Sequence, residues 1–164
     1  MEKVFDYESY QKVDGPSREF TKKVLRLQNP THTIETNPDR YGVDLIVKYG
    51  DKAVAYVEVD NNKKWINKLP DRDYILLFER KEHFLYGKDA CGHTACKNSA
   101  PFSCKELPYG PLPIYFSTVN YNFTSLLLYK ATDALDCPRE TLYANRGEEL
   151  VRKIPVRSCF YYIS

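Results

Sequence analysis

Three acidic residues stand at the open end of a predicted β-hairpin. Residues 43–49 and 53–59 are rich in β-branched and aromatic side chains, and a Gly-Asp pair typical of a tight turn joins them. Asp44 lies at the start of the first strand, and Glu58 and Asp60 lie at the end of the second. Because the start of one strand of a hairpin lies beside the end of the other, we expect the three carboxylates to meet.

Strand geometry orients these carboxylates toward one another. Residues i and i+2 of a strand point to the same face, so Glu58 and Asp60 project together and Val57 and Val59 point to the opposite face. Converging carboxylates repel one another unless a cation lies among them. Oxygen ligands of this kind suit Mg²⁺ or Mn²⁺, and water bound to such an ion can attack a phosphodiester. The alternative is that the acids are solvated residues at strand ends.

The pattern resembles the PD-(D/E)XK nuclease superfamily over about residues 17–81. Asp44 matches the first acidic ligand of that family, Glu58 matches the second, and Glu19 resembles the upstream acid that many members carry on a preceding helix. The order of helix, strand and hairpin is most similar to the Holliday-junction resolvase and phage endonuclease branches. The resemblance implies a restriction-endonuclease-like core, a metal site of Glu19, Asp44, Glu58 and Asp60, and Mg²⁺- or Mn²⁺-dependent endonuclease activity on DNA.

Two positions depart from the family pattern. Asp60 occupies the usual lysine position, and Val43 stands where proline usually precedes the first acid. The lysine normally holds the attacking water or neutralises charge, so another cation must take that role, and Lys63, Lys64 and Lys81 are the candidates. Otherwise Asp60 is a further metal ligand. A catalytically inactive nuclease fold that binds nucleic acid or protein is therefore the alternative function.

Basic residues lie close to the acids in the sequence. The 24 Lys and Arg residues nearly balance the 22 Asp and Glu residues, which argues against nucleic-acid binding by bulk charge. Local binding is compatible with this balance, because the negative charges of an acidic metal centre and the positive charges of a basic rim around it cancel in the net charge of the chain. The candidate phosphate contacts are Lys22, Lys64, Lys68 and Arg80, and the alternative for each is a solvated surface position.

A second group of metal-ligating residue types lies in a segment with little periodicity. Cys91, His93, Cys96 and Cys104 offer four ligands that suit tetrahedral zinc, although the spacing is not that of a standard zinc finger. Reduced thiols in a surface loop are the alternative, and a disulfide is a third interpretation. The sequence therefore leaves a structural zinc site open.

The elements that must position these residues follow from the sequence periodicity. An Asp-Gly-Pro-Ser run at residues 14–17 predicts a helix start with Asp14 as the cap, and Asn29-Pro30 predicts its end. A short helix is expected at residues 131–135. Further strands are expected at residues 32–36, 74–78, 84–86, 114–119, 125–129, 149–154 and 159–163.

The whole chain of 164 residues fits one domain of the α/β (α+β) class. We expect a mixed central β-sheet flanked by helices over residues 17–86, a cysteine-containing loop insert over 87–112, and a mostly β part over 113–164. No apolar run approaches the roughly 18 residues of a membrane-spanning helix, and the first residues lack the apolar core of a signal peptide. We therefore expect an intracellular protein, cytoplasmic or nuclear, with no membrane partner, and the resemblance implies a homodimer.

Overall fold

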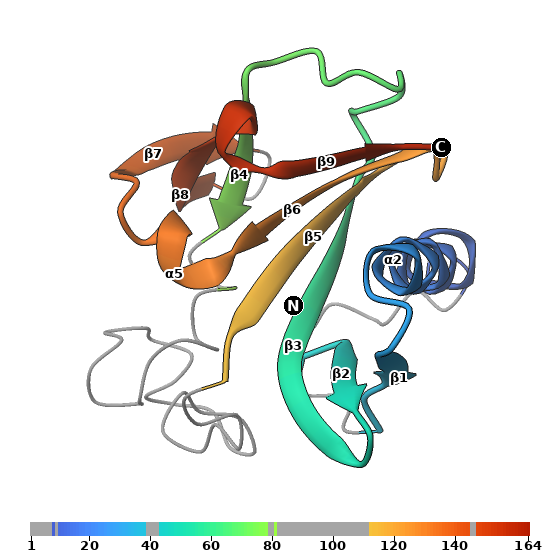
Figure 1. Ribbon diagram of the computed structural model, residues 1–164. Helices are drawn as coiled ribbons and strands as arrows, with labels where there is room; N and C mark the ends of the chain where they lie inside the picture. Colours follow the sequence, from blue (N-terminus) through green and yellow to red (C-terminus); the bar gives the residue numbers. More distant parts are fainter. Residues whose placement is uncertain (1–7, 9, 39–42, 79–80, 82–111, 145–146) are drawn as a thin grey trace.

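The computed structural model describes residues 8, 10–38, 43–78, 81, 112–144 and 147–164 (Figure 1). Its elements, in chain order, are η1 (Tyr10–Asp14), α2 (Gly15–Gln28), β1 (Thr33–Thr36), β2 (Leu45–Tyr49), β3 (Lys52–Asn62), β4 (Tyr74–Phe78), β5 (Ile114–Asn120), β6 (Ser125–Lys130), α5 (Ala131–Ala134), β7 (Arg139–Ala144), β8 (Gly147–Pro155), η4 (Val156–Ser158) and β9 (Phe160–Ile163). The fold is mixed α/β, as the sequence predicts. The expected strand at 84–86 and the insert at 87–112 lie outside the described residues, except for Leu112.

The strands form a mixed six-stranded sheet in the order β1-β2-β3-β5-β6-β9 and a three-stranded sheet in the order β4-β8-β7. The predicted hairpin is confirmed, since β2 and β3 pair antiparallel and Gly50 adopts the left-handed conformation that the tight turn requires, with φ 61°. β3 pairs parallel with β5, and the remaining pairs in both sheets are antiparallel.

Each face of the six-stranded sheet packs against a different layer. α2 covers one face, where Leu25 packs with Leu45 and Val57 of the hairpin (Figure 1). On the other face, Phe116 and Tyr129 pack with Leu77 of the three-stranded sheet and with the residues of α5. A fully buried leucine such as Leu45 contributes about 1.5–3 kcal/mol relative to exposure, so these two interfaces hold the layers together.

The start of α2 differs from the sequence prediction. Asp14 already has right-handed helical backbone angles, φ −71° and ψ −46°, and its side chain makes no capping hydrogen bond. The reason is that η1, a π-helical turn, runs directly into α2, so Asp14 lies inside continuous helical backbone. Pro16 lies in the first turn of α2, as expected, and α2 ends before Asn29. The Asp14 carboxyl is therefore available for tertiary contacts.

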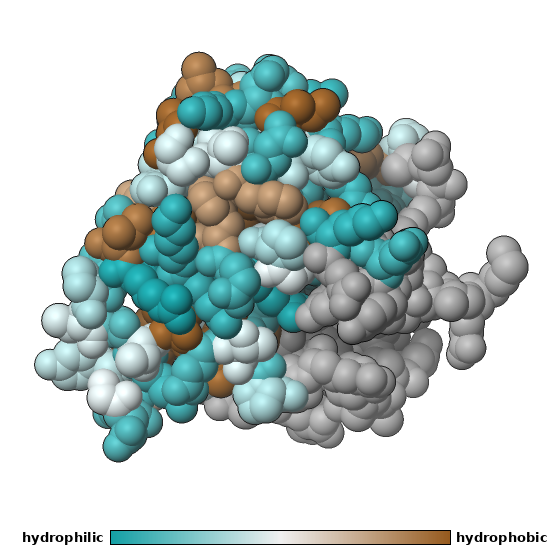
Figure 2. Space-filling model, turned by 90° about the vertical axis from the view of Figure 1, so that its right-hand side faces the viewer, coloured by the Kyte–Doolittle hydropathy of each residue, from teal (hydrophilic) through white to brown (hydrophobic). Residues whose placement is uncertain are grey.

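The surface on the side of α2 is mixed in character. Figure 2 views the molecule from this side and shows hydrophilic side chains surrounding smaller hydrophobic patches. Glu19 and Lys23 are among the exposed charged residues of α2, whereas Phe20 and Val24 face the sheet. Within the described part of the chain, none of the helices has the length and hydropathy needed to span a bilayer.

Candidate metal centre

The candidate site forms where β3 extends beyond β2. The pairing of these strands begins at Leu45 opposite Val57, and residues 58–62 of β3 continue alongside β5. On the side where β2 has not yet begun, η1 and the start of α2 pack against this part of β3. Asp44 immediately precedes β2, so its side chain lies at the edge of β3 next to Glu58.

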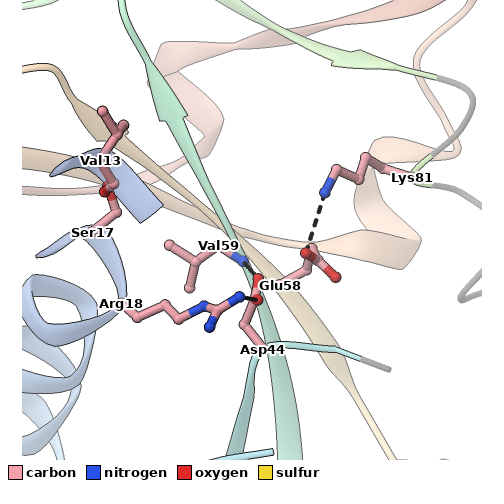
Figure 3. Close-up of polar contacts among 7 residues, drawn as sticks. All are labelled: Val13, Ser17, Arg18, Asp44, Glu58, Val59 and Lys81. Carbon is pink, nitrogen blue, oxygen red and sulfur yellow. Dashed lines mark hydrogen bonds and ion pairs between the residues drawn. The ribbon is translucent and has the colours of Figure 1, made fainter. Parts of the chain in front are cut away.

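Asp44 is held by two donors from different elements. The backbone N–H of Val59 donates to Oδ2 at 2.8 Å, and the Arg18 guanidinium on α2 forms an ion pair with Oδ1 at 2.7 Å (Figure 3). The Asp44 side chain is 11% exposed. Charge-assisted hydrogen bonds of this kind are strong, so the carboxylate has a fixed orientation between α2 and β3.

Glu58 is the most deeply buried of the predicted site residues within the described ranges. Its residue surface is 6% exposed, and Oε1 accepts a hydrogen bond from Lys81 Nζ at 3.2 Å. The second oxygen, Oε2, is buried and has no hydrogen-bond partner. Burial raises the pKa of Glu58 well above its usual range, the Lys81 ammonium opposes the increase, and the Asp44 carboxylate adds to it, both by its charge and by a side-chain hydrogen bond with the protonated form of Glu58. Glu58 thus presents an open oxygen next to a second carboxylate.

Of the three candidate lysines, Lys81 is the one that pairs with a site acid. It follows β4 and approaches Glu58 from the side opposite Arg18 (Figure 3). Burial acts to lower the pKa of Lys81, but the carboxylates of Glu58, Asp60 and Asp44 outweigh it and raise the pKa. Lys81 therefore stays protonated in the site and can donate to an oxygen there.

Asp14 is an acid of this cluster that the sequence analysis missed. Burial raises the pKa of Asp14, Arg18 opposes the increase, and the charges of Asp44 and Asp60 add to it. Asp14 is exposed and lies four residues before Arg18 on continuous helical backbone. In the sequence, Asp14 precedes a Gly-Pro pair that is typical of a capped helix start, so a capping role was predicted. The four-residue spacing from Arg18 was the only indication of another role.

The remaining predicted residues occupy different surroundings. Asp60 is exposed at the i+2 position from Glu58, and its Oδ1 accepts the N–H of Asn61 at 3.1 Å. Glu19 is 68% exposed and pairs with Lys22 at 3.1 Å, so its carboxylate has a partner on α2 itself. Lys63 and Lys64 are exposed in the turn after β3, and Lys68 donates to the carbonyl of Ser164 at 3.4 Å.

Five predicted site residues lie outside the described residues. They are Arg80, Cys91, His93, Cys96 and Cys104. The zinc hypothesis and the Arg80 phosphate contact therefore remain predictions from the sequence.

The donor set is compatible with a hard divalent cation. Among the described residues, no three His, Cys, Asp or Glu side chains lie close enough together to form a metal-binding group. Mg²⁺ is commonly held by one or two carboxylates and keeps several waters, so a pair of carboxylates is a sufficient protein contribution. Asp44 and Glu58 form such a pair, and Oε2 of Glu58 has no N–H or hydroxyl donor from the described part of the protein. The two contacts of Asp44 with Arg18 and Val59 would have to be shared with the ion.

Comparisons with protein-family models, curated proteins and solved structures found no match to this chain. The resemblance to the PD-(D/E)XK superfamily therefore rests on the residues and on the order of the elements.

Proposed function

We propose that this protein is a Mg²⁺- or Mn²⁺-dependent endonuclease that hydrolyses DNA phosphodiester bonds with a metal-activated water. The observation that carries the proposal is the buried Glu58 carboxylate, which has one oxygen without a partner and lies beside Asp44 and Lys81. Buried carboxylates are costly, and an apolar residue of similar size often gives a more stable core. A buried acid with one oxygen that accepts no N–H or hydroxyl hydrogen bond is better explained by binding than by stability.

The side chains have distinct roles in this proposal. Asp44 and Glu58 hold the cation, and the Asp14 and Asp60 charges add to the negative potential that attracts it. A bound divalent ion would supply a water of lowered pKa and offset charge on the phosphate oxygens. Lys81 orients the attacking water or stabilises charge on the phosphate. In the superfamily this is the role of the lysine whose position is occupied here by Asp60.

The order of elements supports the same proposal. α2, the strand β1 and the β2–β3 hairpin follow one another as the superfamily resemblance implies, with the first acid before β2 and the second near the end of β3. Lys81 reaches Glu58 from β4, so a cation from a neighbouring element compensates for Asp60 at the usual lysine position. DNA is favoured over RNA as the substrate, and a homodimer and an intracellular location belong to the same proposal.

A binding module without catalysis is the second candidate function. One observation favours it: both oxygens of Asp44 are already bound to protein donors, Arg18 and the N–H of Val59. If these contacts are permanent, the carboxylate cannot accept a ligand bond and the fold would bind nucleic acid or protein only.

A cleavage assay distinguishes the two candidates. Purified protein is incubated with supercoiled, single-stranded and branched DNA, and with RNA, in Mg²⁺, Mn²⁺ or chelator. The proposal predicts metal-dependent DNA cleavage that Asp44→Asn, Glu58→Gln and Lys81→Met each reduce by about 100-fold or more. Glu19→Gln is the matched control, because Glu19 is exposed and pairs with Lys22, and it should retain activity.

Two results would contradict the nuclease proposal. The first is the absence of metal-dependent cleavage of every DNA substrate by the wild-type protein. The second is cleavage that Asp44→Asn and Glu58→Gln leave unchanged. Zinc is tested separately by metal analysis of the purified protein, where a content near zero removes the structural site proposed for Cys91, His93, Cys96 and Cys104.

A further inference from the structure

A basic cleft lies at the start of β4, beside Tyr74. The chain continues to Lys81 from the other end of this strand. The cleft has a volume of about 650 Å³ and forms between the segment that leads into β4 and the end of β8. Among the described residues that line it, three are cations, Arg72, Lys153 and Arg157, and one, Asp73, is a carboxylate. The lining therefore has an excess of positive charge.

Tyr74 holds two of these cations close together. The Arg72 guanidinium lies 5.7 Å and the Lys153 ammonium 4.8 Å from the centre of the Tyr74 ring, and Arg72 also donates to the Tyr74 hydroxyl at 3.1 Å. Contacts of cations with an aromatic face are favourable, but the two positive charges repel each other. The ring thus fixes the position of the cations without neutralising them.

Among the described residues, one of the three cations has an acidic partner. Lys153 pairs with Glu140 at 3.0 Å. Within the described ranges, neither Arg72 nor Arg157 forms an ion pair with a carboxylate. Guanidinium groups recognise phosphate through paired N–H donors. The two arginines at this cleft therefore suit a phosphate as ligand. Leu69, which is 63% exposed, adds an apolar surface beside the cations.

We propose that this cleft binds a backbone phosphate of the nucleic-acid strand, away from the bond that is cleaved. The inference rests on the proposed nuclease function, because it makes the cleft a second contact of the same substrate. β4 spans about 13 Å from Tyr74 to Phe78 at roughly 3.3 Å per residue. Lys81 follows the far end of this strand, so β4 alone places the cleft and the candidate metal centre at opposite ends of a length that corresponds to roughly four base pairs at about 3.4 Å each.

The consequence is a preference for substrates that extend beyond the cleaved bond. A strand that reaches both sites gains charge-assisted contacts at the cleft, whereas a shorter strand makes contacts only around Glu58 and Lys81. Phosphate contacts of this kind hold the substrate in register and add no sequence specificity.

The test compares two variants of equal charge. Arg72→Gln/Arg157→Gln removes the two unpaired arginines, and Lys52→Gln/Lys130→Gln removes two exposed cations that do not line the cleft. Binding of a labelled 24-base-pair duplex is measured by fluorescence anisotropy in chelator, at salt concentrations from about 50 to 200 mM. For the arginine variant we expect weaker binding and a smaller slope in a plot of log Kd against log salt concentration. The slope should fall by about 1 to 2, since each lost phosphate contact lowers it by about 0.9. The lysine variant should keep the wild-type slope.

Several outcomes would overturn the cleft proposal. One is a wild-type slope and affinity for the arginine variant, and another is no binding of the duplex by the wild-type protein. Calorimetric titration with inorganic phosphate supplies a further arm. If phosphate binds the wild type but not the arginine variant while duplex binding is the same for both, the cleft holds a free anion and not a strand.

The cleft proposal and the nuclease proposal fail in different ways. Metal-dependent cleavage together with an unchanged slope in the arginine variant overturns the cleft alone. A reduced slope in that variant, together with no cleavage of any DNA by the wild type, overturns the nuclease alone.

Discussion

Replacing Lys81 with methionine tests whether the Lys81–Glu58 pair is a buried charge pair. Lys81 Nζ lies 3.2 Å from Glu58 Oε1, and Glu58 is 6% exposed, so loss of the ammonium leaves a buried carboxylate without its cation. Breaking a fully buried pair in this way costs about 3–5 kcal/mol. Because the Lys81 side chain is 31% exposed, solvent screens part of the interaction, and we expect a loss of about 2–3 kcal/mol.

The loss should depend on pH in a defined direction. Without Lys81, the folded-state pKa of Glu58 lies still further above its unfolded value, because the opposing effect of the ammonium is gone. A group whose pKa is raised by folding contributes stability at pH values below its unfolded pKa and loses it as pH rises. The variant should therefore be more destabilised at pH 8 than at pH 5.

Urea denaturation at both pH values, in chelator, measures these effects. Lys48→Met is the matched control, since Lys48 pairs with Glu35 at 2.8 Å on the surface and its loss should change the midpoint little. Adding Glu58→Gln to Lys81→Met should recover part of the lost stability, because no charge is then buried. A loss below about 1 kcal/mol that is equal at pH 5 and pH 8 would show that Lys81 and Glu58 do not form a buried charge pair.

Three further predictions concern other parts of the molecule. Arg18→Gln should cost about 1–2 kcal/mol in urea denaturation, because Asp44 loses its 2.7 Å ion pair while keeping the N–H of Val59; no loss would show that the pair is unimportant. Leu127→Ala should cost about 2–5 kcal/mol, since Leu127 is fully buried between the sheets, and a loss under 1 kcal/mol would contradict that packing. Burial raises the pKa of the Cys159 thiol to about 11, so its alkylation by iodoacetamide at pH 8, followed by peptide mass spectrometry, should be about 100-fold slower than that of an ordinary thiol; a rate equal to the ordinary one would contradict the burial.

The hairpin was predictable because its information is local. Alternating and β-branched residues on both sides of Gly50 specify two strands, and the period of two places Val57 under α2 and Glu58 on the opposite face. The strands at the C-terminal end were predictable for the same reason. β7 was not predicted, because its polar and largely exposed residues lack the apolar alternation of the other strands.

The tertiary contacts of the candidate site could not be predicted from spacing. Lys81 is 23 residues from Glu58 and reaches it through β4, a strand of the second sheet, whereas Lys63 is only five residues away and remains exposed in a turn. Asp14 was expected to cap α2, but the π-helical turn before it continues the helix, so its carboxyl makes no capping hydrogen bond and senses the charges of Arg18, Asp44 and Asp60 instead. In both cases the position of an element decided the contact, and that position depends on residues distant in the sequence.

Titration of the protein with Mn²⁺, followed by electron paramagnetic resonance of the free ion, measures whether Glu58 is a metal ligand. We expect saturable binding by the wild type and by Glu19→Gln, and loss of that binding in Glu58→Gln, because Oε2 of Glu58 is the proposed ligand atom. Equal binding by the wild type and Glu58→Gln, or no binding by either, would contradict the assignment of Glu58 as a metal ligand.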